Sequence, residues 1–162
     1  FGAINGGIRY NIIPDSVELV GTIRSFDDGM RAQAVKDLSN VAEHVAAAHG
    51  ATVVAKIPDT VGNPVTVNNP ALTARVLPSL KKVAGAEVVE MTLTTGAEDF
   101  AYYAKEVPGF FFFVGSTPKG VDASTAPSNH SPQFFLDESA LPLGTRALLQ
   151  ISLDYLNGVQ GG

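Results

Sequence analysis

The sequence lacks cysteine, has few charged residues and contains no long hydrophobic run. Without cysteine the chain forms neither a disulfide framework nor a thiolate metal site. Charged residues make up 17% of the chain, and the formal net charge of -5 comes from scattered Asp and Glu. Because nucleic-acid binding needs Lys and Arg clustered on one face, this distribution predicts no DNA or RNA partner.

The longest apolar run, residues 109–115, is far shorter than the roughly 20 residues that span a bilayer. No charged region of the kind that begins a signal peptide opens the chain. We therefore expect no membrane partner and a soluble, cytoplasmic protein, with a periplasmic or secreted location as the alternative.

The chain has the length and apolar content of one ordinary domain. Its 162 residues are 45% hydrophobic, which is enough to bury a core. The first residues, Phe1-Gly2-Ala3-Ile4, read like the middle of a strand and lack an initiator Met. This start indicates a fragment of a longer chain.

The first part of the chain predicts strand, strand, helix and strand. Residues 16–26 alternate apolar and polar side chains, as a half-buried strand does, and Asn5-Gly6-Gly7 has the turn chemistry to join this strand to residues 1–4. A helix begins after the capping residue Asp27 and ends at Gly50, and residues 51–57 are rich in β-branched side chains. This order matches the last four elements of a ferredoxin-like split βαβ unit.

Pro, Gly and Asn accumulate over residues 58–70 and mark a domain boundary. Beyond it the patterns predict a helix at residues 71–83, a strand at 87–91, a short helix at 98–105, a buried strand at 110–114 and a last helix at 139–157. Alternating strands and helices favour an α/β layer. We therefore predict one partial domain at residues 1–67 and a second at residues 68–162.

His130 lies in a loop rich in Pro and Ser that follows the predicted buried strand. Loops at the carboxyl ends of such strands commonly carry the sites of α/β enzymes, and a neutral imidazole there can ligate zinc. The alternative is a histidine in an ordinary surface turn.

The run Gly96-Ala97-Glu98-Asp99-Phe100 places two adjacent carboxylates at the first turn of a predicted helix. They could line a site, or they could simply be an acidic first turn favoured by the helix dipole.

Asn11 and Arg24 suit the recognition of an acylated amino acid. An Arg guanidinium presents a planar fork to a carboxylate, and an Asn amide can donate to a carbonyl oxygen that gains negative charge. The alternative is that Asn11 shapes a turn and that Arg24 is a solvated strand residue.

Other catalytic patterns are missing. His44 and His49 are five residues apart on one helix, which does not suit a shared metal, and no His-Glu-x-x-His pattern is present. Nor is there a Gly-x-Ser-x-Gly nucleophile elbow or a phosphate-binding Gly-rich loop. Serine hydrolases and nucleotide enzymes are thereby disfavoured.

Four segments in register resemble the metal-dependent amidohydrolase branch of the aminoacylase and carboxypeptidase family, which includes hippurate hydrolases and indole-acetyl-amino-acid hydrolases. They are residues 11–15 together with 21–26, residues 96–100, residues 107–115, and His130-Ser131-Pro132 together with Asp137-Glu138. Their order fits across nearly the whole chain.

The resemblance implies an α/β catalytic domain of the zinc-exopeptidase type, interrupted by a ferredoxin-like lid that is also the interface of a homodimer. Residues 1–67 would be the end of the lid and residues 68–162 the last part of the catalytic domain. Two divalent metal ions, zinc or else manganese, cobalt or nickel, would activate a water molecule, and a Glu would be the general base.

The resemblance also implies roles for six residues. His130 matches a metal ligand, Asn11 the catalytic group for the scissile carbonyl and Arg24 the group for the substrate carboxylate. Gly96, Glu98 and Asp99 would line the substrate pocket. The general base and the other metal ligands would lie outside this chain, so we expect the chain alone to be inactive.

The implied reaction is hydrolysis of the amide bond of an N-acyl amino acid or a short peptide. Two alternatives remain open at this point. One is a non-catalytic dimerisation and interaction module derived from such an enzyme. The other is an α/β binding protein for a small carboxylate, in which Arg24 would matter and His130 would not.

Overall fold

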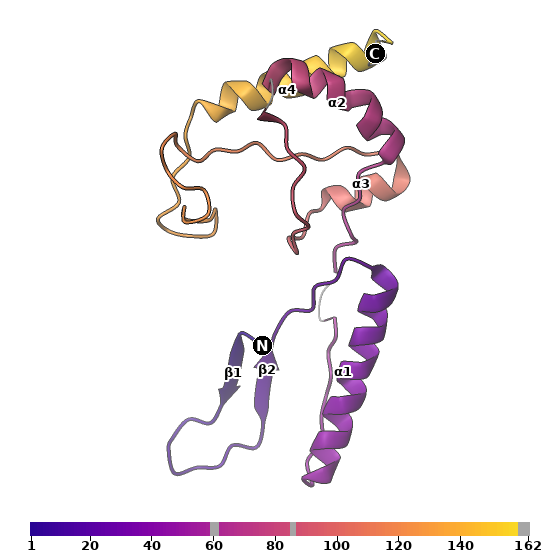
Figure 1. Ribbon diagram of the computed structural model, residues 1–162. Helices are drawn as coiled ribbons and strands as arrows, with labels where there is room; N and C mark the ends of the chain where they lie inside the picture. Colours follow the sequence, from indigo (N-terminus) through magenta and orange to yellow (C-terminus); the bar gives the residue numbers. More distant parts are fainter. Residues whose placement is uncertain (59–61, 85–86, 159–162) are drawn as a thin grey trace. The chain divides into compact units, whose positions relative to one another are not determined.

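The computed structural model describes residues 1–58, 62–84 and 87–158. The chain divides into two compact units (Figure 1). The first comprises Phe1–Val65 and Thr94–Asp99, and the second comprises Thr66–Leu93 and Phe100–Gly162. The short segment 94–99 is thus part of the first unit, although its neighbours in sequence belong to the second.

The first unit begins with a β-hairpin. Strand β1 (Ala3–Gly6) pairs antiparallel with β2 (Val17–Val20), and Gly6 lies opposite Val17. The expected hairpin is confirmed, but Asn5-Gly6-Gly7 is not a tight turn, because Asn5 and Gly6 are paired within β1. The chain leaves the strand at Gly7, which has a φ of 75°, a conformation that glycine adopts without a steric cost.

Strand β2 is shorter than the expected strand at residues 16–26, and all its residues are exposed. Beyond the paired residues, one more backbone hydrogen bond runs from the Gly2 N–H to the Val20 carbonyl (2.9 Å). Strand β2 ends there because no further described residue pairs with it. A strand extends only as far as a neighbour satisfies its backbone groups.

Helix α1 (Asp28–Ala48) confirms the helix expected after Asp27. The Asp27 side chain accepts the Met30 N–H at 2.7 Å, which satisfies one of the free donors of the first turn. The helix ends at Ala48, and just beyond it Gly50, with a φ of 69°, donates its N–H to the Ala47 carbonyl while Ala51 donates to the Ala46 carbonyl. None of the residues of α1 is buried.

In the second unit, α2 (Pro70–Ala84) and α4 (Ala140–Leu156) lie side by side (Figure 1). Both helices were expected, and Pro70 and Pro142 stand in first turns, where a missing N–H costs nothing. The buried apolar side chains of this pair are Val76, Leu80, Ala140 and Ala147.

A buried carboxylate joins the two helices. Asp154 of α4 is 9% exposed and accepts hydrogen bonds from Ser79 (2.6 Å) and Lys82 (3.1 Å) of α2 and from Gln150 (2.9 Å) of its own helix. A buried charge is tolerated only when it is paired and hydrogen-bonded, and here both conditions hold.

Helix α3 (Phe100–Glu106) precedes an extended segment, residues 109–116, that contains the four consecutive Phe residues 110–113. Gly109 packs directly on α3, since a Cβ added there would lie 3.0 Å from the Phe100 ring. The rings of Phe100 and Phe111 are 5.4 Å apart, within the range of favourable aromatic pairs.

The strands expected at residues 51–57, 87–91 and 110–114 are wrong. The described residues contain four helices and one two-stranded sheet, and these three segments run without a strand partner. A strand is defined by a neighbour that bonds its backbone, and no described segment takes that place. The described structure is therefore a mixed arrangement of helices and one hairpin, and the division into lid and catalytic domain stays a prediction.

No helix in the described part of the chain is both long enough and apolar enough to cross a membrane.

The Asp154 network predicts a specific pH dependence of stability. Hydrogen bonds from Ser79, then Gln150 and Lys82, lower the pKa of Asp154 from its ordinary value of 3.8. A lowered carboxyl pKa contributes stability that is present above the unfolded-state pKa and is lost as the pH falls through the folded-state pKa.

We expect the melting temperature of the wild-type chain to fall on acidification below about pH 4, and that of Asp154→Asn to be lower at pH 7 and less dependent on pH. Circular dichroism melts from pH 2 to pH 7 measure this. Asp37→Asn on exposed α1 is the matched control and should follow the wild type. Parallel curves for Asp154→Asn and wild type would contradict the assignment.

Candidate functional site

His130 lies in a long loop, residues 117–136, between the extended segment and α4. The base of this loop is closed by the Asp137 N–H, which donates to the Ser116 carbonyl at 2.9 Å. Next to His130, the Ser131 N–H donates to the Ser128 carbonyl at 2.9 Å and shapes a turn. His130 itself is exposed, so its imidazole is accessible to a ligand.

Two carboxylates stabilise the backbone of this loop region. The pKa of Asp122 is lowered, first by its hydrogen bond with the Ser124 side chain, and the pKa of Asp137 is lowered, first by its hydrogen bond with Ser139. Both therefore act as ionised acceptors for local N–H groups. They shape the loop and the start of α4.

Arg24 contacts the Gly96 segment. Its Nη1 donates to the Thr95 carbonyl at 2.8 Å, and both residues belong to the first unit. Within the described residues the guanidinium makes no other hydrogen bond, and the side chain is exposed. Two segments expected to bind substrate, 71 residues apart, are thus adjacent.

The two carboxylates of this segment do not lie where the sequence predicted. Helix α3 begins at Phe100 and has no acidic residue in its first turn, so Glu98 and Asp99 precede the helix. Glu98 is half-buried and Asp99 is exposed. Residues 94–98 have no regular secondary structure, and the Thr95 carbonyl accepts a hydrogen bond from Arg24.

Asn11 lies in the loop between β1 and β2. It is exposed, and among the described residues its side chain has no hydrogen-bond partner. Its amide is therefore available to a ligand.

The described residues do not form a metal site by themselves. No three His, Asp or Glu side chains of residues 1–58, 62–84 and 87–158 gather in a way that could hold an ion. His44 faces its own helix, with Nδ1 2.6 Å from the Asn40 carbonyl oxygen. A catalytic zinc normally takes three protein ligands, so His130 can be only one member of such a set.

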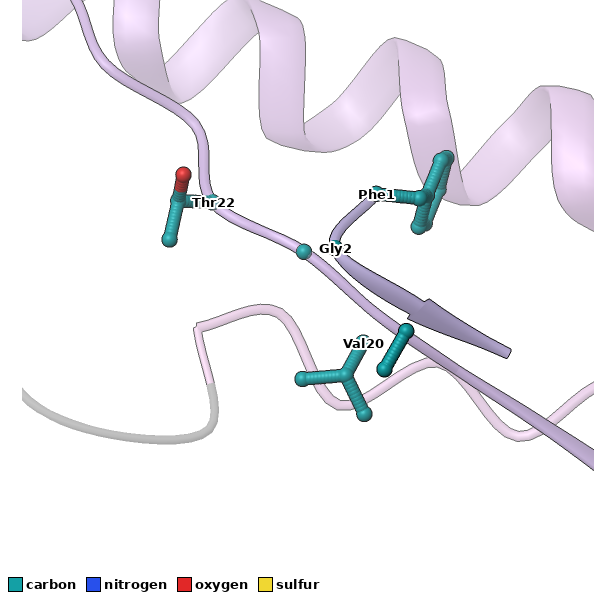
Figure 2. Close-up of a pocket in the computed structure, with 6 residues that line it drawn as sticks. Phe1, Gly2, Val20 and Thr22 are labelled. Atoms are coloured by element: carbon teal, nitrogen blue, oxygen red, sulfur yellow. The ribbon is translucent and has the colours of Figure 1, made fainter. Parts of the chain in front are cut away.

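A shallow hollow of about 440 Å³ lies beside the hairpin (Figure 2). It has a mostly apolar lining, and the Thr22 hydroxyl is its only labelled polar side-chain group in the view. The lining residues are Phe1, Gly2, Ala3, Val20, Gly21 and Thr22. None of the candidate site residues borders it, so it carries none of the expected chemistry.

Sequence reasoning missed two polar contacts that hold these segments in place. One is the Thr95 carbonyl, a backbone acceptor that no side-chain pattern reveals. The other is the pair Asn68 and Asn69, which bonds the extended segment and caps α2. The signal for the second was available, because Asn followed by Pro is a typical helix start.

Comparison with known proteins assigns the family. Residues 6–154 match the family model Peptidase family M20/M25/M40. The chain therefore belongs to this peptidase family, as the four motif segments indicated. Enzymes of the family are generally metal-dependent.

Three curated relatives illustrate the match. Thermostable carboxypeptidase 2 of Saccharolobus solfataricus is 35% identical over 154 residues, which are 95% of this chain and 38% of that protein. N-acetyl-L-cysteine deacetylase of Bacillus subtilis is 35% identical over 86% of this chain and 31% of its own length. IAA-amino acid hydrolase ILR1-like 4 of Arabidopsis thaliana is 35% identical over 94% of this chain and 37% of its own.

The chain spans between about a third and two fifths of the length of these relatives. No solved structure matches it significantly.

The contact between Arg24 and Thr95 predicts that Arg24 orders the Gly96 segment. In Arg24→Gln we expect residues 94–99 to become more mobile, because the shorter neutral amide loses a charge-assisted bond. Backbone ¹⁵N relaxation measures this as lower order parameters at these residues. Arg9→Gln, in the hairpin loop, is the matched control. Unchanged order parameters in Arg24→Gln would show that the bond does not hold the segment.

Proposed function

We propose that this chain forms part of an amidohydrolase that cleaves the amide bond of an N-acyl amino acid or a short peptide. The observation that carries the proposal is the family match over residues 6–154. The names of the relatives add the substrate class, since they include a carboxypeptidase, an N-acetyl-L-cysteine deacetylase and an IAA-amino acid hydrolase. What such substrates share is an amide bond beside a free carboxylate.

Arg24 is the proposed group for the substrate carboxylate. The Thr95 carbonyl accepts a bond from Nη1. This bond orients the guanidinium and leaves the remaining N–H groups available. An exposed guanidinium held in one orientation suits bidentate binding of a carboxylate. The adjacent Gly96, Glu98 and Asp99 would line the same pocket.

Asn11 is the proposed group for the scissile carbonyl. Its exposed amide can donate to the oxygen on which negative charge develops during attack on the amide. In a homodimer formed through residues 1–67, Asn11 and Arg24 would reach the site of the neighbouring subunit.

His130 would supply one ligand to a pair of divalent metal ions, zinc or else manganese, cobalt or nickel. The exposed imidazole at the turn of residues 128–131 suits this role. The described residues bring together no group of three His, Asp or Glu side chains that would supply the other ligands. We therefore propose that residues outside this chain complete the site and that the chain alone is inactive.

A non-catalytic dimerisation module is the second candidate. The observation that favours it is the exposure of α1, none of whose residues is buried, and of the hairpin, where Ile4 and Leu19 are 68% and 54% exposed. Apolar side chains left open on a helix and a sheet suit a protein interface. Such a module would bind no metal.

Metal content and hydrolysis separate the two candidates. We expect a version extended upstream to the length of its relatives to bind about two metal ions and to hydrolyse N-benzoylglycine, as a two-metal mechanism requires, and the chain alone to do neither. Elemental analysis and release of glycine measure this.

His130→Ala in the extended protein should abolish turnover and lower the metal content, whereas His44→Ala on α1 should change neither. Activity in the chain alone would refute the proposal that its site is incomplete. Absence of both metal and turnover in the extended protein would favour the dimerisation module.

The carboxylate role of Arg24 predicts a selective effect on substrate binding. In the extended protein, Arg24→Gln should raise KM for N-benzoylglycine by about 10- to 100-fold, the range expected for hydrogen bonds to a charged group. With N-benzoylglycinamide, which lacks the carboxylate, the same substitution should change KM little. Arg9→Gln is the control for the loss of one charge. Equal effects on both substrates would contradict a carboxylate contact.

A further inference from the structure

The side chain of Asn68 forms hydrogen bonds with both the backbone N–H and the backbone carbonyl of Phe111. Its Nδ2 donates to the Phe111 carbonyl at 2.8 Å, and its Oδ1 accepts the Phe111 N–H at 2.7 Å. Asn68 is half-buried, and it is 43 residues from Phe111 in sequence. Both distances are those of well-formed bonds.

The next residue continues the same pattern through its backbone. The Asn69 N–H donates to the Gly109 carbonyl at 2.9 Å. In extended chain, the N–H and C=O of alternate residues face one side, which is the side that a neighbouring strand would bond. Asn68 and Asn69 therefore take the place of a strand along Gly109 and Phe111.

The bonded segment runs from α3 to the loop of His130, and both belong to the second unit. At one end Gly109 packs on α3, which directly follows Glu98 and Asp99. At the other end the Ser116 carbonyl accepts the Asp137 N–H at the base of the His130 loop. Between them, the Phe111 ring packs against Phe100 and Phe113.

We propose that Asn68 is a positioning residue that sets the placement of residues 109–116, and through Ser116 the base of the His130 loop. The role of that loop in metal binding rests on the proposed function, whereas the placement itself does not. No other described side chain bonds the Phe111 peptide. Loss of the Asn68 side chain would therefore leave the N–H and the carbonyl of Phe111 without a protein hydrogen-bond partner among the described residues.

Adjacent asparagines offer a matched pair of substitutions. Asn68 must donate and accept at once, so Asn68→Asp puts a carboxylate oxygen against the Phe111 carbonyl. The Asn69 side chain only accepts, from the Leu72 N–H at 2.9 Å at the start of α2. An Asp is among the best capping residues there and complements the helix dipole. The same change should therefore disrupt one site and preserve the other.

Amide hydrogen exchange of the full chain is the test. We expect Asn68→Asp to speed exchange at both Phe111 and Asp137 by about tenfold or more, the change that corresponds to roughly one lost hydrogen bond. Asn68→Ala, which removes both bonds without adding a charge, should do the same if Asn68→Asp fails to fold. Asn69→Asp should exchange like the wild type at both positions.

Equal exchange in the Asn68 and Asn69 variants would overturn the proposal, and so would a change at Phe111 that does not reach Asp137. In the extended protein, competition with a chelator should show weaker zinc binding for Asn68→Ala and unchanged binding for Asn69→Asp. Unchanged zinc affinity in Asn68→Ala would also overturn the link to His130. If no version binds zinc, the proposed function fails, and exchange at Asp137 still decides the placement.

Discussion

The arrangement of the second unit depends on how the backbone N–H and carbonyl of Phe111 are hydrogen-bonded. An extended segment must satisfy its backbone N–H and C=O groups, and the described residues place no strand beside residues 109–116. Asn68 and Asn69 meet this requirement on one side, by a side-chain amide and a backbone N–H. The same two residues directly precede α2, and Asn69 caps it, so one short stretch of chain contacts both the helix and the extended segment.

Helix α2 and the extended segment, which both contact Asn68 or Asn69, each lead to another part of the second unit. Helix α2 extends to Ser79 and Lys82, which bond the buried carboxylate of Asp154 and so join α2 to α4. The extended segment leads to Ser116, which closes the loop that presents His130. Helix packing and loop placement thus depend on polar contacts as well as on the small apolar core.

The helices were predictable because their signals are local. The capping residue Asp27, the glycine stop at Gly50 and Pro142 in the first turn of α4 are each visible within a few residues of sequence. The strands were less predictable, because a strand needs a pairing partner that can lie at any distance in the sequence. Residues 51–57 and 110–114 have strand composition without a described strand beside them.

In the candidate site, too, some features were predictable from the sequence and others were not. The motif segments identified the family and singled out His130, Arg24 and the Gly96 segment by their residue types. The contact of Arg24 with the Thr95 carbonyl is a backbone interaction between distant segments, and residue types do not encode it. Glu98 and Asp99 were placed in the first turn of a helix that in the structure begins two residues later than predicted, at Phe100.

The central claim is that His130 is a metal ligand of an amidohydrolase whose remaining ligands lie outside the described residues. The most direct test is anomalous diffraction at the zinc edge from crystals of the protein extended upstream. The account predicts a zinc peak about 2.0 to 2.1 Å from a ring nitrogen of His130. A zinc site formed without His130, with its imidazole in solvent, would contradict it.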